Sequence, residues 1–171
     1  MTDELLNCDK NNIQVVAFCL GDEEYAVPIN YVQEIITRKG STRIPKTRHY
    51  IEGMINLRGQ IVPVIDSRKL LNVKKSEKTS IKDERVILIS LSEEKVGLLV
   101  DKVFEVVNLK AEDIEVPPVS IEENVDFIIG VGKYKDRLLI LINPEKFLAD
   151  LDSENVKHLT KVADSIKEAV I

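Results

Sequence analysis

The sequence contains the stretch Ile65-Asp66-Ser67-Arg68-Lys69-Leu70-Leu71 and, 77 residues further along, the matching stretch Ile142-Asn143-Pro144-Glu145-Lys146-Phe147-Leu148. A second pair of matching stretches has an offset of 71 residues: Val32-Gln33-Glu34-Ile35-Ile36 and Val103-Phe104-Glu105-Val106-Val107. Order, spacing and residue type all agree, which indicates an internal duplication. The two copies span about residues 13–72 and 84–149, and the Lys-, Ser- and Glu-rich segment between them is typical of a loop.

Each copy has the pattern of several short strands. In the first copy we expect strands over Ile13–Leu20 and Glu24–Pro28, then over Ile51–Asn56 and Gln60–Ile65. About five such strands in some 60 residues favour a small closed barrel, which buries little apolar surface by itself. Two barrels packed together would share a further apolar core, so we expect them to behave as one domain.

Two short helices are expected in the first copy. Asn30 can cap the start of one, with Gln33 at capping-box spacing, and Val32, Ile35 and Ile36 would then share one helical face. Asp66 can cap a final helical turn that ends at Leu71 and is stopped by Asn72.

The composition is β-leaning and excludes several classes of function. The 171 residues include 20 Ile and 20 Val but no Trp, and the net charge is −5. An acidic chain with no basic block and few aromatic residues is not expected to bind nucleic acid. No apolar run is long enough to cross a membrane. Residues 1–12 lack the apolar region of a secretory signal and are expected to form a flexible tail.

Reactive groups are few. Cys8 and Cys19 cannot make a tetrahedral zinc site, and Cys19 follows an apolar run, as expected for a buried thiol. His49 would serve as a general base only if a nucleophile folded beside it, and no catalytic motif lies near it. We therefore expect no enzyme, no cofactor and no metal. An enzyme that uses His49 or the acidic residues stays as an alternative, which a ligand-sized pocket around a titratable residue would support.

The segment after Ser153 has a different pattern. Val156, Leu159, Ala163, Ile166 and Val170 follow a 3-4-3-4 spacing, which predicts an amphipathic helix over residues 153–170. Such a helix would either pack on the barrels of the same chain or bind a partner.

The two copies differ at one hairpin tip. The first copy has Asn56-Leu57-Arg58-Gly59, where Gly59 suits a tight turn with positive φ and Arg58 projects from the hairpin. Arg58 is either an incidental surface residue or a recognition residue, and Glu34 is placed to pair with it. Val32 and its counterpart Val103 belong either to a core or to a groove between the barrels, and periodicity does not separate the two.

One long run carries a resemblance to a known family. The run is Ile51-Glu52-Gly53-Met54-Ile55-Asn56-Leu57-Arg58-Gly59-Gln60-Ile61-Val62-Pro63-Val64-Ile65-Asp66-Ser67-Arg68. It resembles the signature of the CheW-like domain family of bacterial chemotaxis, in which Leu is usual at position 67. Tyr25–Ile29, Val96–Val103 and Ile129–Val131 resemble further family signatures. The resemblance covers about residues 13–150.

The resemblance implies a mainly β fold of two packed SH3-like five-stranded barrels, about residues 13–72 and 84–149, with exchange of strands between them left open. It also implies a non-enzymatic adaptor that couples methyl-accepting chemoreceptors to the histidine kinase CheA. The expected partners are the CheA regulatory domain and the cytoplasmic tips of the receptors. We expect a cytoplasmic protein that is monomeric when isolated and recruited to receptor arrays. A tandem SH3-like module of another signalling pathway is the remaining alternative.

The resemblance assigns roles to particular residues. The expected receptor-binding groove consists of Val16, Ile29, Val32, Glu34, Arg58 and Val103. The expected kinase-binding loop consists of Arg43, Ile44 and Pro45. The residues expected to form the structural motif are Gly53, Asn56, Leu57, Gly59, Gly97 and Gly130.

Overall fold

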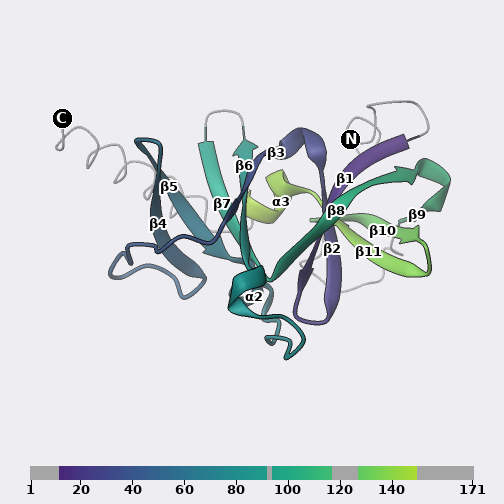
Figure 1. The fold of residues 1–171 in the computed structure, drawn as a ribbon. Helices are drawn as coiled ribbons and strands as arrows, with labels where there is room; N and C mark the ends of the chain where they lie inside the picture. The colour runs from purple at the N-terminus through teal and green to yellow at the C-terminus, as the bar shows by residue number, and fades with distance from the viewer. Residues whose placement is uncertain (1–11, 92–93, 117–126, 150–171) are drawn as a thin grey trace.

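The computed structural model of the chain describes residues 12–91, 94–116 and 127–149. These residues form two β-sheets, which lie on the left and on the right of Figure 1. The six-stranded sheet has the order β8-β1-β2-β11-β10-β9 and the five-stranded sheet has the order β3-β6-β7-β5-β4. The mainly β fold predicted from the sequence is confirmed.

The strands are short, as their sequence pattern predicts. The six-stranded sheet contains β1 (Asn12–Leu20), β2 (Glu23–Pro28), β8 (Lys102–Lys110), β9 (Ile114–Glu115), β10 (Ile128–Tyr134) and β11 (Arg137–Ile142). The five-stranded sheet contains β3 (Val32–Thr37), β4 (Ile51–Leu57), β5 (Gln60–Asp66), β6 (Arg85–Leu91) and β7 (Glu94–Val100). The helices in the described part of the chain are η1 (Ile29–Tyr31), α2 (Ser67–Leu71), η2 (Ile81–Asp83), η3 (Ala111–Asp113) and α3 (Pro144–Ala149).

Each sheet combines strands of both sequence copies. Strands β1 and β2 of the first copy join β8 to β11 of the second, while β3 to β5 of the first copy join β6 and β7 of the second. Two parallel pairs make part of this connection, β11 with β2 and β5 with β7. Neither sheet therefore coincides with residues 13–72 or with residues 84–149.

The apolar side chains form three clusters. The largest contains residues of both sheets and of α3, among them Phe18, Ile65, Ile89 and Phe147. A second cluster belongs to the six-stranded sheet and a third to the five-stranded sheet. The shared core that the duplication predicts is thus confirmed, and the branched aliphatic residues supply most of all three clusters.

The helix predicted to start at Asn30 is wrong. Residues 29–31 make one 3-10 turn without a side-chain cap, and Val32–Thr37 then form strand β3, which pairs antiparallel with β6. The partly buried and exposed residues alternate along β3, which is the strand period. Val, Ile and Thr are β-branched, and an available edge of β6 satisfies their backbone hydrogen bonds, so the strand is favoured over a single isolated helical turn.

The helix predicted after Asp66 is confirmed. The Asp66 carboxylate accepts hydrogen bonds from the backbone N–H groups of Arg68 and Lys69 at 3.1 and 3.3 Å. Asn72 ends α2 in the left-handed conformation, with φ of 55°.

The two chain ends carry further predictions. Asn12, which we expected in the N-terminal tail, begins β1, and the rest of that tail lies outside the described residues. The predicted helix over residues 153–170 also lies outside them. Among the described residues, no helix is long and apolar enough to cross a membrane.

Candidate functional site

The four apolar residues predicted to form a groove all lie at the shared core. Val16 is only 1% exposed and belongs to that core itself. Ile29, Val32 and Val103 are partly buried and pack against the same cluster. The alternatives of core or groove were open for Val32 and Val103, whereas Val16, which the resemblance assigned to the groove, is a core residue. The other three keep exposed surface, and we call them the apolar rim.

Val32 and Val103 occupy equivalent places in the two sheets. Each lies at the start of an outermost strand, Val32 on β3 and Val103 on β8. The strand register shifts next to each of them, between Val32 and Glu34 in one case and opposite Ala17 and Phe18 in the other. A bulge bends a strand and re-aims its side chains, so the duplication has kept a local distortion at both positions.

Two further aliphatic residues on these strands were not selected from the sequence. Ile35 on β3 is 38% exposed and Val106 on β8 is 51% exposed. Their neighbours on the adjacent strands, Ile87 and Val16, belong to the shared core. The expectation of a helix at residues 30–36 hid Ile35. If residues 32–37 are taken as a strand paired with β6, Ile35 lies opposite Ile87 and therefore faces the shared core.

The hairpin tip between β4 and β5 is a tight turn of two residues with positive φ. Arg58 has φ of 50° and Gly59 has φ of 85°. The Asn56 side-chain oxygen accepts a hydrogen bond from the Gly59 N–H at 3.0 Å. Such turns match the twist of the flanking strands, so the direction of the Arg58 backbone is fixed by the turn.

Arg58 pairs with Glu34, as predicted, although Glu34 lies on a strand and not on a helix. The guanidinium contacts both carboxylate oxygens, at 3.1 and 2.5 Å. The hydrogen bonds from Arg58 lower the pKa of Glu34. Arg58 is 68% exposed on its side chain, so the pair contributes little to folding. It instead holds a cation and an anion in a defined arrangement, with Glu34 two residues after Val32 on β3.

The second copy presents different groups at the equivalent places. Its hairpin tip has Lys135 and Asp136, also with positive φ. Lys135 lies 5.2 Å from the centre of the Tyr134 ring. Glu105, the counterpart of Glu34, pairs with Arg137 at 3.2 Å and not with the tip. The two copies therefore match at Val32 and Val103 but differ in the charged residues at and around the hairpin tip.

The predicted structural residues have identifiable packing roles. A Cβ on Gly53, whose φ is +149°, would lie 2.5 Å from the Thr42 carbonyl oxygen, and a Cβ on Gly130 would lie 2.8 Å from the Glu115 carbonyl oxygen. At both positions the chain crosses at a distance that only glycine permits. A Cβ on Gly97 would lie 2.7 Å from a side-chain methyl group of Val86, and Leu57 is buried in the core of the five-stranded sheet.

The loop predicted to bind the kinase is anchored at its centre. Ile44 packs against the shared core, and its carbonyl oxygen accepts a hydrogen bond from the Thr47 hydroxyl at 2.9 Å. Arg43 and Pro45 are exposed on either side of it. The loop thus exposes the Arg43 guanidinium and the Pro45 ring on either side of the partly buried Ile44 side chain.

Other reactive groups do not join these residues. Cys19 is buried, and burial raises the pKa of its thiol to about 11. His49 is exposed and makes an edge contact with the Tyr50 ring at 5.6 Å. A cavity of about 660 Å³ opens beside Phe104 and Leu138, with the titratable residues Cys19 and Lys102 also in its lining, and none of the predicted receptor- or kinase-binding residues lines it. Within the described ranges, no group of three His, Cys, Asp or Glu side chains could hold a metal ion.

Comparison of the sequence with models of protein families identifies the family of the chain. The model of the CheW-like domain matches residues 14–152. The chain is a member of the CheW-like domain family. The relationship that the sequence motifs indicated is thereby confirmed.

Several CheW proteins are similar over most of their length. The chemotaxis protein CheW of Helicobacter pylori is 35% identical over 136 residues, which are 80% of this chain and 81% of that protein. The CheW of Klebsiella aerogenes is 36% identical over 151 residues, which cover 86% and 89% of the two chains. The CheW of Bacillus subtilis is 34% identical over 147 residues, covering 85% and 91%.

A solved CheW structure has the same architecture. The scaffolding protein TtCheW from Thermoanaerobacter tengcongensis superimposes with a TM-score of 0.69 at 38% identity, covering 77% of this chain and 88% of that one. The two barrels are therefore of the SH3-like type. Membership of the CheW-like family gives the protein a coupling or scaffolding role in chemotaxis.

Proposed function

We propose that the protein is the adaptor that couples methyl-accepting chemoreceptors to the histidine kinase CheA, so that receptor signals control kinase activity. The observation that carries this proposal is the apolar rim together with an ordered Arg58–Glu34 pair, whose carboxylate lies two residues after Val32 on β3. Apolar anchors with a polar margin suit a helical partner, because the anchors supply burial and the charges supply orientation. The cytoplasmic tip of a chemoreceptor is such a partner.

The kinase would contact a different surface. We assign the contact with the regulatory domain of CheA to the loop of Arg43, Ile44 and Pro45. The adaptor acts in the cytoplasm, without a cofactor, and joins the receptor array through these two contacts. When isolated, it is a monomer.

The test is reconstitution from purified components. The protein is mixed with CheA and with membranes that contain a chemoreceptor, and co-sedimentation and kinase activity are measured. We expect sedimentation of both soluble proteins and a change in kinase activity that depends on the adaptor. Unchanged activity without co-sedimentation would refute the proposal, and capture of an unrelated kinase would favour a scaffold for another pathway.

Two matched variants locate the receptor contact. Val32→Asp and Val103→Asp each place a charge at equivalent points of the apolar rim. We expect both to weaken receptor binding while CheA binding survives. Loss of both partners together would mean misfolding, which circular dichroism reveals. The exposed neighbour Gln33→Asp is the control, because it adds the same charge to β3 next to the rim residue.

A further inference from the structure

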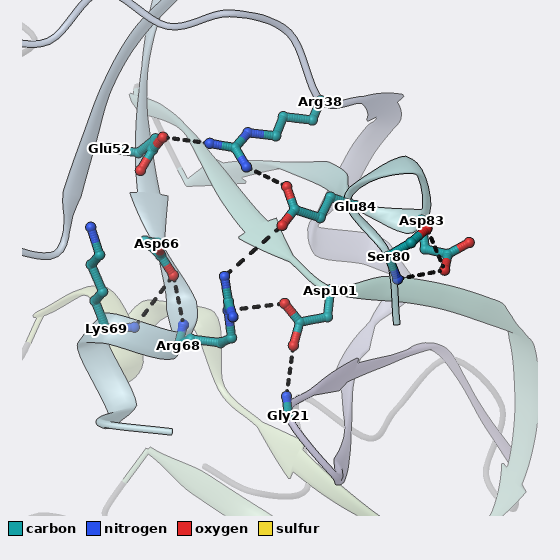
Figure 2. A network of polar contacts seen from close by, with 10 residues as sticks. All are labelled: Gly21, Arg38, Glu52, Asp66, Arg68, Lys69, Ser80, Asp83, Glu84 and Asp101. Atoms are coloured by element: carbon teal, nitrogen blue, oxygen red, sulfur yellow. Dashed lines mark hydrogen bonds and ion pairs between the residues drawn. The ribbon is translucent and has the colours of Figure 1, made fainter. Parts of the chain in front are cut away.

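One buried carboxylate connects the two sheets. Asp101 lies between β7 and β8, where the chain passes from the five-stranded to the six-stranded sheet, and it is 3% exposed. One carboxylate oxygen accepts a hydrogen bond from the Gly21 N–H at 2.7 Å. The other contacts the Arg68 guanidinium at 2.9 Å. Figure 2 shows Asp101 between these two groups, one in the β1–β2 turn and the other on α2.

The same guanidinium is one of two cations around a second buried acid. Glu84 is 4% exposed and lies 3.9 Å from Arg68, and its other oxygen is hydrogen-bonded to Arg38. Arg38 also pairs with Glu52 on β4 at 2.8 Å. The chain of contacts in Figure 2 therefore runs from β4 to the β1–β2 turn. Two buried carboxylates depend on Arg68 for part of their compensation.

The β1–β2 turn is also held by close packing. The Asp101 N–H donates to the Cys19 carbonyl oxygen at 3.1 Å. A Cβ on Gly21, whose φ is +61°, would lie 2.5 Å from the Lys74 carbonyl oxygen. The Ser76 hydroxyl donates to the Asp22 carboxylate at 2.8 Å. The segment after α2 thus lies directly against the turn, and the turn has little freedom to move.

The arrangement is not repeated at the equivalent positions. By the offsets of the duplication, Asn30 corresponds to Asp101 and Glu145 corresponds to Arg68, and both are exposed. The barrel fold therefore does not require these charges. Burial raises the pKa of Asp101 in spite of its two partners, so its ionised form is not fully compensated. A buried ion pair of this kind contributes more to position than to stability.

Asp101 lies close in sequence to one residue of the apolar rim. Val103 follows Asp101 by two residues and pairs with Phe18 of β1, while Val16 lies in the same strand further from the turn. Because β8 begins directly after Asp101, the contact between Asp101 and Gly21 also determines the position along β1 at which β8 starts. Val32, in contrast, belongs to the five-stranded sheet, to which α2 and Arg68 are attached.

We propose that Arg68 and Asp101 form an intersheet clamp that fixes the β1–β2 hairpin against the five-stranded sheet, and that Arg68 is thereby a positioning residue for the apolar rim. The second half rests on the proposed function, since it concerns receptor binding. Without the clamp, Val103 shifts relative to Val32, although neither residue is altered.

The clamp can be tested on the isolated protein through Cys19. Cys19 is 5% exposed, lines the cavity beside Phe104 and Leu138, and is bonded through its carbonyl group to Asp101, so we expect its thiol to react faster when the junction opens. In a Cys8→Ser background, reaction with a thiol reagent is followed for the parent, Arg68→Met, Arg68→Lys and Lys69→Met. Lys69 is exposed on the same helix, and its variant makes the same change of charge and side chain.

We expect Arg68→Met to react at least about tenfold faster than Lys69→Met, because opening of the junction becomes easier. Arg68→Lys should lie between them, since lysine keeps the charge but not the planar donor geometry. Val62→Ala, in the core of the five-stranded sheet, lowers stability away from the junction and controls for general weakening. Equal rates for Arg68→Met and Lys69→Met, or for Arg68→Met and Val62→Ala, would overturn the clamp.

Receptor binding tests the positioning role separately. We expect Arg68→Met to bind a receptor fragment more weakly than Lys69→Met, with folding verified by circular dichroism. Fast thiol reaction with unchanged binding would overturn the positioning role. If the parent itself binds no receptor fragment, the proposed function fails, and the thiol rates still decide whether the clamp exists.

Discussion

The short helices α2 and α3 occupy equivalent places in the two copies, yet their surroundings differ. Each is capped by the residue before it, α2 by Asp66 and α3 through the Asn143 side-chain oxygen, which accepts from the Glu145 N–H at 3.0 Å. At the next comparable position α2 has Arg68 in a buried ion network, whereas α3 has the exposed Glu145. The duplication has thus kept the backbone motif and changed the charges, which gives the two junctions different properties.

Of the paired substitutions on the two helices, we expect the largest difference in the free energy of unfolding when the Arg68 guanidinium of α2 is removed. Arg68→Met leaves Asp101 and Glu84 buried without one cation, and we expect a loss of about 3–5 kcal/mol in the free energy of unfolding. Glu145→Met should change it by less than about 0.5 kcal/mol, as for an exposed site. Urea unfolding followed by circular dichroism measures both. Adding Asp101→Asn to Arg68→Met should recover part of the loss, and no recovery would contradict the coupling of the two residues.

A second difference concerns the glycines at which the chain crosses itself. Gly53→Ala combines a clash with the Thr42 carbonyl and an unfavourable φ, so we expect it to lower the free energy of unfolding by more than about 2 kcal/mol. Gly130→Ala meets the Glu115 carbonyl but has no positive φ, and a loss on the order of 1 kcal/mol is expected. Thermal unfolding ranks the two. A larger loss for Gly130→Ala than for Gly53→Ala would show that the chain crossing at Gly130 is the more rigid one.

The helix caps should differ less. The Asp66 carboxylate accepts from the backbone N–H groups of Arg68 and Lys69, whereas the Asn143 side chain accepts from that of Glu145. We expect Asp66→Ala to cost about 1–2 kcal/mol and Asn143→Ala about 0.5–1 kcal/mol. Urea unfolding of the two variants and of the Lys69→Met control would measure this. Equal losses would mean that the second bond to Asp66 contributes nothing.

The smallest effect on stability is expected at the hairpin tips. Arg58→Ala removes an exposed ion pair, so its melting temperature should match that of Lys135→Ala, while receptor-dependent control of the kinase is lost only in Arg58→Ala. The pair lowers the pKa of Glu34, so its small stabilisation is present at neutral pH and is lost as the pH falls through that lowered pKa. A large fall in melting temperature for Arg58→Ala would make the residue structural.

Local features of this fold could be predicted from the sequence. The cap at Asp66, the stop at Asn72 and the hairpin at Arg58 and Gly59 depend on neighbouring residues, and all three were found in the structure. The shared core followed from the small size of each copy. The Arg58–Glu34 pair was also anticipated, since both residues were expected on exposed surfaces.

Features that depend on distant partners were missed. Val32, Ile35 and Ile36 have a spacing that fits one helical face, and only the edge of β6, some fifty residues later, makes them a strand. The contacts of Arg68 with Asp101 and of Asp101 with Gly21 join segments that no local pattern relates. Which aliphatic residues keep exposed surface likewise depends on how the sheets meet.

The exchange of strands between the copies has a consequence for how the chain folds. Strand β2 has β1 as one neighbour and β11 as the other, and Tyr25 of β2 pairs with Ile140, a sequence separation of 140 − 25 = 115 residues. Closing so long a loop must precede the gain from the pairing, which makes folding slow, in the range of about milliseconds to seconds. On the ribosome, the first copy emerges with one side of β2 unpaired and remains incomplete until β11 has been synthesised.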